Sequence, residues 1–418
     1  MGNLIYQIAM RFLASALKIA APFNQKIKLG VEGRNSALKR LEELFSKQPQ
    51  SRPVAWFHAA SLGEFEQGRP VIEAYRIAYP DHFILLTFFS PSGYEVRKNY
   101  TGADFIAYLP IDTRANAAEF VRIVKPRIAF FIKYEFWLNY LLELKNQHCY
   151  IISFSSIFRP GQIFFKPHGF LHRQMLSSVD YFFVQNEASV QLLNTIGISS
   201  CSIAGDTRFD RVREIALNAR DLPEAALFKS DKICLVAGSV WEADMEVLIP
   251  ALNKIGRSLK AIIAPHEIKS EQIESWRKQL AGEAVRYSEL KAGMDTAGFD
   301  YLIIDNIGML SSLYRYGELA YIGGSFGAGL HNILEAATFG LPVIFGNKGY
   351  QRFQEAQDLV KLGGAFAIAG STDISALLDK MLQNEAYRTH AGSISKDYVA
   401  SGTGATAIIM DQVKEIMG

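Results

Sequence analysis

Residues 321–346 hold the side chains whose types and spacing point most directly to chemistry. A glycine-rich loop there joins a short apolar run to a helical pattern. Its glycines let the backbone approach an anionic group closely, and Asn332 is placed to cap a helix over residues 333–339. The N–H groups at such a helix start bind phosphate. Glu335, three residues after the cap, would either complete a capping box or bind a ribose hydroxyl. The segment therefore predicts a phosphate-binding loop.

The wider pattern of the chain predicts the elements that carry this loop. After residue 50, short apolar runs alternate with amphipathic stretches such as 113–124 and 136–146. Seven such runs lie between residues 54 and 204, and six between residues 233 and 368. This alternation is typical of a parallel sheet with helices on both faces. Because ligands bind at the carboxyl ends of such strands, we expect functional side chains in the loops that follow the runs.

A change in composition separates two sheets. Residues 206–230 carry more charge than their surroundings and contain no strand pattern, so we place a domain junction there. The sequence therefore predicts an α/β protein with two Rossmann-like, doubly wound domains, over residues 26–210 and 211–418. They face a cleft, which is the expected ligand site.

Residues 1–25 predict an amphipathic helix that lies in a membrane surface. Basic residues dominate the first 40 positions, where Glu32 is the sole acid. A polar stripe at helical spacing consists of Gln7, Arg11, Ser15 and Lys18, and the remaining positions are mainly apolar. Arg11 and Lys18 disfavour both a cleaved signal peptide and a spanning helix, because they interrupt the apolar stretch. A helix packed on its own domain is the remaining alternative.

Composition gives evidence against a nucleic-acid-binding protein and against a fold held by disulfides or zinc. A net charge of +2 gives no support to nucleic-acid binding. The three cysteines, Cys149, Cys201 and Cys234, are far apart and odd in number, which disfavours a disulfide framework or a zinc site and favours a reducing compartment.

Small and acidic residues follow the predicted strands of the first domain. Glu64 comes directly after the first strand and Glu135 after the fourth, where each is a candidate for binding a substrate. For Glu64, a helix-start acid is an equal alternative. Two loops between strand and helix offer N–H groups to an anion, and their candidate residues are Ser61, Gly63, Ser90, Ser92 and Gly93.

Six motifs stand in the order and at roughly the spacing of one enzyme family. They are Phe57-His-Ala-Ala-Ser-Leu-Gly-Glu-Phe65, Thr87-Phe-Phe-Ser-Pro-Ser-Gly93, Tyr134-Glu-Phe-Trp-Leu-Asn139, Gln185-Asn-Glu187, Gly205-Asp-Thr-Arg-Phe-Asp210 and residues 321–346. Over nearly the whole chain, the sequence resembles the 3-deoxy-D-manno-octulosonic acid (Kdo) transferases of lipopolysaccharide synthesis. These are glycosyltransferases of the GT-B fold.

The resemblance implies a reaction and a place in the cell. The family transfers Kdo from CMP-Kdo to a lipid A precursor, inverting the anomeric centre, at the cytoplasmic face of the bacterial inner membrane. Such an inversion needs a general base opposite the leaving phosphate. Glu32 matches the position that the family uses as this base, although a surface charge balanced by Lys28 and Arg34 would otherwise be favoured.

The resemblance also implies a donor site in the second domain. The residues expected to line it are Ser239, Glu242, His266, Asp305, Gly308, Gly324, Ser325, Gly329, His331, Asn332 and Glu335. Many relatives carry other residues where this chain has Met309 and Ile333, and also in the acceptor region at Lys133, Tyr134 and Leu138.

We expect no metal ion and no further cofactor, because a monophosphate donor has little charge to neutralise and no Asp-x-Asp loop stands out. Two other classes remain open. A nucleotide-sugar epimerase of the same shape explains the second domain, and a non-catalytic membrane scaffold explains the first 25 residues.

Overall fold

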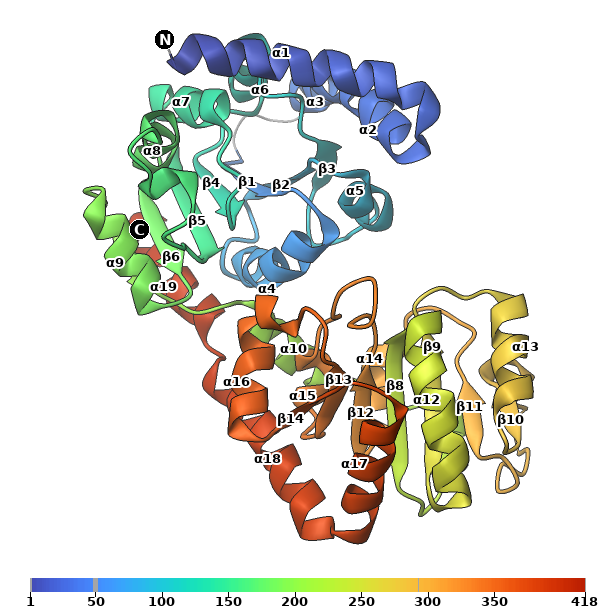
Figure 1. Cartoon of the computed structure of the whole chain (residues 1–418). Coiled ribbons are helices and arrows are strands. Elements are labelled where there is room, and N and C mark those ends of the chain that lie inside the picture. The colour runs from blue at the N-terminus through green and yellow to red at the C-terminus, as the bar shows by residue number, and fades with distance from the viewer. Residues whose placement is uncertain (1, 48–51, 292, 418) are drawn as a thin grey trace. The chain divides into compact units, whose positions relative to one another are not determined.

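The computed structural model describes residues 2–47, 52–291 and 293–417. The chain divides into two compact units (Figure 1). The first comprises Met1–Arg211 with Thr403–Gly418, and the second is Val212–Gly402.

The first unit is built on a parallel sheet of seven strands in the order β3-β2-β1-β4-β5-β6-β7. The strands are β1 (Val54–Ala59), β2 (Phe83–Phe88), β3 (Phe105–Tyr108), β4 (Ile128–Ile132), β5 (Tyr150–Ser156), β6 (Tyr181–Val184) and β7 (Cys201–Ile203). Successive residues pack on opposite faces, so Trp56 and Phe57 belong to two separate apolar clusters. Because β1 lies between β2 and β4, the strand order reverses there and opens a switch point.

Helices cover both faces of this sheet. One face packs against α3 (Ala37–Lys47), α6 (Arg114–Val124), α7 (Leu138–Asn146) and α8 (Phe170–Ser177), and the other against α4 (Leu62–Ala78) and α19 (Ala405–Met417). The unit also contains α1 (Gly2–Ala20), η1 (Ala21–Phe23), α2 (Gln25–Asn35), α5 (Pro91–Arg97), η2 (Ile163–Phe165) and α9 (Glu187–Thr195). Short polar residues fix the helix starts: Thr113 Oγ1 caps α6 by accepting from the N–H of Asn116 at 3.2 Å.

The end of the chain returns to the first unit, whereas we expected residues 211–418 to form one domain. Asp210, at the start of α10 (Arg208–Leu217), accepts hydrogen bonds from the N–H groups of Gly404 and Thr406 at 2.6 and 2.7 Å. Ile409 and Val413 of α19 are then fully buried in an apolar cluster of the first sheet. Burial of this helix face is the physical reason for the return.

The second unit is also doubly wound around a parallel sheet, in the order β10-β11-β9-β8-β12-β13-β14. Its strands are β8 (Cys234–Val240), β9 (Lys260–Pro265), β10 (Ala284–Arg286), β11 (Tyr301–Ile303), β12 (Leu319–Ile322), β13 (Val343–Gly346) and β14 (Ala365–Ile368). The strand β10 is absent from the predicted strands because its apolar run is only Ala284 and Val285, followed by Arg286. The switch point lies at β8, between β9 and β12.

The helices of the second unit are mostly short on one side of the sheet. They are α11 (Pro223–Lys229), α12 (Glu242–Ile255), η3 (Gly256–Ser258), α13 (Ser270–Gln279), η4 (Tyr287–Glu289), α14 (Leu310–Leu313), η5 (Tyr314–Tyr316), α15 (Leu334–Ala337), η6 (Tyr350–Arg352), α16 (Gln354–Leu362), α17 (Ser371–Gln383) and α18 (Glu385–Ser401). The sequence predicts a helix over residues 333–339, but α15 is four residues long and a left-handed Gly340 follows it.

Helix α1 packs on the first unit through one face and leaves an apolar face outside. Tyr6 Oη donates to Asp112 at 2.6 Å, and Gln7 Nε2 donates to Asn139 at 2.6 Å. Gln7 therefore belongs to the packed face and not to an exposed polar stripe. Large apolar side chains remain exposed on the helix: Leu4, Ile5, Ile8, Phe12 and Ile19.

By length and composition, the helical stretch from residue 2 to residue 23 could cross a membrane. A signal sequence near an N-terminus passes the same test.

Candidate functional site

Two glutamates come together at the switch point of the first sheet. Glu64 lies in the first turn of α4 and accepts a 2.5 Å hydrogen bond from the N–H of Ala60, and Glu135 follows β4. Burial, and after it the charge of Glu135, raises the pKa of Glu64 to about 7. A carboxyl group with such a pKa exchanges a proton readily near neutral pH.

Two rings hold Glu135 in place. Trp137 Nε1 donates towards both Glu135 Oε2 and His58 Nε2, at 3.2 Å in each case. His58 is fully buried in β1, and its Nδ1 lies 2.9 Å from Thr87 Oγ1. Because Nε2 accepts from Trp137, a neutral His58 carries its proton on Nδ1. Sequence reasoning missed His58, although a single polar residue inside the apolar run of β1 was a usable signal.

The loop after β1 leaves space at the start of α4. The side chain of Ser61, at the N-cap, makes no capping hydrogen bond. A Cβ added at Gly63 would meet only Ser61 Oγ, at 4.0 Å, so packing does not require glycine there. A small ligand group therefore has room beside the N–H groups of this seventeen-residue helix.

The loop after β2 lies beside the loop after β1, because the N–H of Ser90 donates to the carbonyl of Ala60 at 2.7 Å. Its residues serve local structure. Ser90 Oγ caps α5 by accepting from the N–H of Ser92 at 3.2 Å. A Cβ at Gly93 would lie 2.2 Å from the ring of Phe88, so this glycine is required for packing.

Glu32 lies on an exposed side of α2, with Lys28 Nζ 4.0 Å from its Oε1. The opposite side of this helix faces the unit: Cβ atoms at Gly30 and Gly33 would meet Pro91 and Tyr108, and the Arg34 guanidinium lies 4.3 Å from the centre of the Phe89 ring. Helical periodicity turns Glu32 away from these contacts. The first unit by itself does not bring Glu32 to Glu64 and Glu135.

One buried carboxyl group orders the glycine loop of the second unit. Asp244 of α12 accepts hydrogen bonds from the N–H groups of Trp241 and Gly324 and from the hydroxyl of Tyr321, all at 2.9 Å. Burial raises the pKa of Asp244. A Cβ at Gly323 would lie 2.3 Å from the carbonyl of Ser239, so only glycine fits there. Sequence reasoning missed Asp244, which reads as an ordinary helix acid.

The loop holds a buried hydroxyl group with an unmet hydrogen bond. Ser325 is 2% exposed, and among the described residues its Oγ has no hydrogen-bond partner. Gly324 and Gly329 on either side have φ angles of 100° and 106°, which favour glycine. Buried hydroxyl groups are normally satisfied, so the loop is suited to a ligand that supplies an acceptor or a donor at this point.

Three aromatic rings, those of Trp241, His266 and His331, stack together beside the glycine loop. Trp241 Nε1 donates to His331 Nε2 at 3.0 Å, with the two ring planes 9° apart. The His266 ring stacks on both, with centroids 4.3 Å from Trp241 and 4.5 Å from His331. Burial, with His266 as a smaller cause, lowers the pKa of His331 to about 4. His331 is therefore neutral at pH 7, with its proton on Nδ1. The sequence analysis included both histidines but missed Trp241.

The next predicted donor residues are Asn332, Glu335 and Ser239. Asn332 accepts from the N–H of Leu334 and donates to Glu335 Oε1, both at 3.2 Å, so these two side chains form one unit. Ser239 lies inside β8 at a bulge, not after the strand, with a φ of 54°.

Three others take part in contacts within the protein. Glu242 Oε2 accepts from Gln272 and Trp276 of α13 at 2.7 and 2.9 Å. Asp305 accepts from the N–H of Ser288 at 3.0 Å, and the carbonyl of Gly308 accepts from Arg220 at 2.7 Å. In the described part of the chain, no cluster of three or more His, Cys, Asp or Glu side chains could hold a metal ion.

Comparison with known proteins finds that the chain is similar to one enzyme family. The family model described as 3-deoxy-D-manno-octulosonic-acid transferase (kdotransferase) matches residues 36–211. The chain is 28% identical over 364 residues to the 3-deoxy-D-manno-octulosonic acid transferase of Chlamydophila psittaci, which covers 81% of this chain and 80% of that protein. It is 26% identical over 352 residues to the transferase of the same name from Aquifex aeolicus, with 82% and 90% covered.

The fold is also similar to that of solved structures outside this family. A UDP-GlcNAc 2-epimerase from Neisseria meningitidis, bound to UDP-GlcNAc, matches with a TM-score of 0.62 and 14% identity, over 87% of this chain and 100% of that one. At this identity the likeness concerns the fold alone.

Proposed function

The chain belongs to the Kdo transferases, and from this premise we propose that its donor is CMP-Kdo and its acceptor a lipid A precursor of the lipid IVA type. It is a glycosyltransferase of lipopolysaccharide biosynthesis with the GT-B architecture of two doubly wound units. One observation carries the proposal: each sheet has a cluster of functional groups at its own switch point, acidic in the first unit and suited to an anion in the second.

The donor side of the proposal uses the glycine loop of the second unit. Ser325 Oγ and loop N–H groups bind the phosphate of CMP-Kdo, and Glu335, held by Asn332, binds the ribose. The orphaned hydroxyl of Ser325 supports this role. The four-residue α15 contributes little dipole, so the loop itself neutralises the monophosphate. No metal ion is part of the proposed reaction.

The acceptor side uses the first unit. The hydroxyl oxygen of the acceptor attacks the anomeric carbon of Kdo, the bond from that carbon to the phosphate oxygen breaks, and CMP leaves. Glu32 takes the proton of the hydroxyl, in agreement with the family resemblance. Glu64 and Glu135 bind the acceptor beside the open start of α4, which the space at Gly63 supports.

The proposed location is the cytoplasmic face of the bacterial inner membrane, with α1 in the lipid surface. The exposed apolar residues Leu4, Ile8 and Phe12 support this contact, and Tyr6 and Gln7 join the helix to the enzyme. Deleting residues 2–22 should therefore move the protein to the soluble fraction. Aggregation of the truncated protein would contradict a purely peripheral role for α1.

The reaction is tested by incubating the full chain with tetra-acylated lipid A precursor and freshly made CMP-Kdo. Mass spectrometry should find the acceptor heavier by one or more Kdo units and CMP released in equal number. A nucleotide sugar converted without any lipid acceptor would favour the epimerase class instead.

A further inference from the structure

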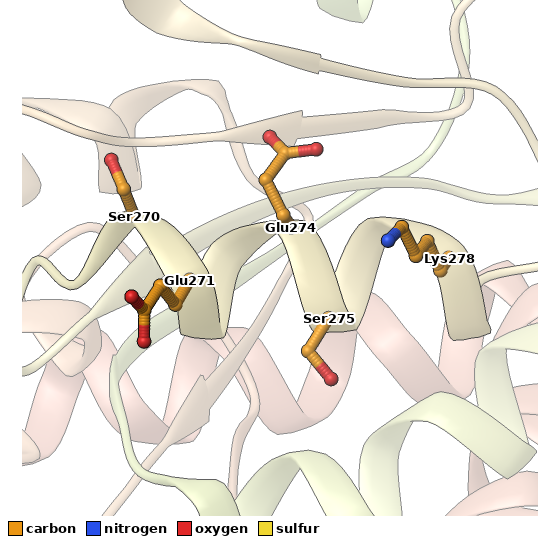
Figure 2. Close-up of a pocket in the computed structure, with 5 residues that line it drawn as sticks. All are labelled: Ser270, Glu271, Glu274, Ser275 and Lys278. Carbon is orange, nitrogen blue, oxygen red and sulfur yellow. The ribbon is translucent and has the colours of Figure 1, made fainter.

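Two hollows among the described residues differ in their walls: one follows a single helix, and the other has walls from several elements and shares Glu135 and Trp137 with the site of the first unit. The first follows α13 and is lined by Ser270, Glu271, Glu274, Ser275 and Lys278. Figure 2 shows Ser270 and Glu274 on one side of the helix and Glu271 and Ser275 on the other. Since one helix supplies every residue, this hollow has no opposite wall.

The second hollow is an open cavity of about 290 Å³ in the first unit. Four elements line it: α1, the segment after β4, η2 and α8. Its lining residues are Tyr6, Met10, Tyr134, Glu135, Phe136, Trp137, Phe164, His172 and Met175. All of them belong to one unit, so the cavity is complete within it.

The walls of this cavity offer mostly apolar surface. Met10, Phe136, Phe164 and Met175 contribute thioethers and rings, and the Phe136 and Phe164 rings meet edge to face at 5.9 Å. The hydroxyl groups of the two tyrosines are already used, that of Tyr6 by Asp112 and that of Tyr134 by the carbonyl of Ile157. His172 also lines the cavity, and among the described residues its buried Nδ1 has no hydrogen-bond partner. A ligand would therefore find polar groups at His172, Glu135 and Trp137, whereas the remaining walls fit a hydrocarbon chain.

The cavity borders both the proposed site for the sugar of the lipid acceptor and the helix that carries the proposed membrane surface. One wall is Glu135, whose neighbour Trp137 also contacts His58 at the switch point. Another part of the lining comes from Tyr6 and Met10 of α1, a helix that exposes Leu4, Ile5 and Ile8 to solvent. A lipid reaching Glu135 from a membrane at α1 would pass its hydrocarbon part along this cavity.

We propose that this cavity binds one acyl chain of the lipid acceptor while the sugar of the same molecule lies at Glu64 and Glu135. This inference rests on the proposed function for its acceptor. It assigns α1 a second role, because Tyr6 and Met10 become part of the substrate site.

The first test uses Trp137 as a reporter and needs no transferase activity. A lysophospholipid with a brominated chain should quench the fluorescence of the full chain, and an unbrominated one should not. The variant Trp137→Phe, which retains Trp56, Trp241 and Trp276, should lose most of this quenching. Lipid A precursor added in excess should restore the fluorescence of the natural chain.

Two outcomes of this test overturn the inference. Equal quenching in the natural chain and in Trp137→Phe would mean that the chain binds elsewhere. Quenching that saturating lipid A precursor does not relieve would mean that an ordinary membrane lipid or detergent occupies the cavity.

The second test separates the cavity from the reaction. Met10→Trp fills the cavity, whereas Ile8→Trp adds the same ring to the exposed face of α1 as a matched control. Met10→Trp should raise the KM for tetra-acylated acceptor at least about tenfold, as expected when about two methylene groups remain in water. Its kcat, and transfer to a deacylated acceptor, should match those of the control.

The outcomes for the cavity and for the proposed function are distinct. Equal KM values for Met10→Trp and Ile8→Trp, with transfer intact in the natural chain, overturn the cavity alone. No transfer by the natural chain overturns the proposed function, while the quenching test still decides whether a hydrocarbon chain enters.

Discussion

The two sheets carry different chemistry at the same topological position. In the first unit, the edge at β1 and β4 presents the carboxyl groups of Glu64 and Glu135, held by ring N–H and backbone N–H groups. In the second unit, the edge at β8 and β12 presents a glycine loop, a buried hydroxyl and three stacked rings. The comparison teaches that strand order selects where a site forms, while the residues of the loops select what it binds.

The two edges also differ in how they respond to pH. The charge state of Glu64 changes near pH 7, because burial and Glu135 oppose its ionisation. The loop of the second unit is held by glycine geometry and by Asp244, and His331 stays neutral above about pH 4. We therefore expect strong pH effects to originate in the first unit.

The largest expected effect tests which carboxyl group of the first unit is the general base. Glu32→Gln should lower turnover by about 100-fold or more, the usual scale for loss of a general base. Calorimetry should find CMP binding unchanged, since the proposed CMP site lies in the second unit. Glu43→Gln is a matched control, because Glu43 pairs with Lys39 at 3.9 Å on an exposed helix in the same i,i+4 geometry. Near-normal turnover in Glu32→Gln would transfer the role to Glu64 or Glu135.

The next prediction concerns the pH dependence of stability. The folded state favours the protonated form of Glu64. The contribution of Glu64 to the free energy of unfolding is therefore full below about pH 4.5 and is lost as the pH rises to about 7. Through Glu64, the natural chain should lose about 2 kcal/mol of stability between pH 5 and pH 8, and Glu64→Gln should not lose it. The melting temperature of the variant should therefore fall less over this pH range.

Glu135→Gln sharpens the same measurement. This variant should make the loss of stability between pH 5 and pH 8 smaller without removing it, because burial is the larger cause of the raised pKa of Glu64. An equal fall in the natural chain and in Glu64→Gln would show that Glu64 titrates normally.

A third prediction concerns the anion site of the second unit. Ser325→Ala should weaken CMP binding by about 1 to 2 kcal/mol while leaving the free chain equally or more stable, because the variant removes an unsatisfied buried hydroxyl. Calorimetry and thermal unfolding measure the two effects separately. Unchanged CMP affinity together with a lowered melting temperature would contradict a ligand-binding role for Ser325.

The smallest expected effect concerns the stacked rings of Trp241, His266 and His331 in the second unit. Trp241→Phe removes the N–H that occupies His331 Nε2, so the pKa of His331 should rise from about 4, but only in part, because burial, its main cause, remains. Histidine titration followed by NMR measures this change. Trp276→Phe is the matched control, because it removes an N–H donor to Glu242 elsewhere in the same unit. Identical titration in both variants would exclude an effect of Trp241 on His331.

Local pattern predicted much of the fold. Apolar runs such as 319–322 form strands because both faces of a parallel sheet are buried. The strand β10 was missed because its apolar run is only Ala284 and Val285, followed by Arg286. The polar stripe of α1 was partly wrong, because the partner of Gln7 is Asn139, far away in the sequence. A helical pattern identifies an amphipathic helix but not which polar residue finds a partner.

The sequence by itself determined the two parallel sheets, the glycine loop and the loops that follow β1 and β4, because these depend on apolar runs and on residue types close together in the chain. Only the tertiary structure decided which distant groups meet. It brought Glu135 to Glu64, Trp137 to His58, and Asp244 to Tyr321 and Gly324. The physical reason is that burial and hydrogen bonding between such groups arise only when the strands align side by side, and these contacts set their protonation.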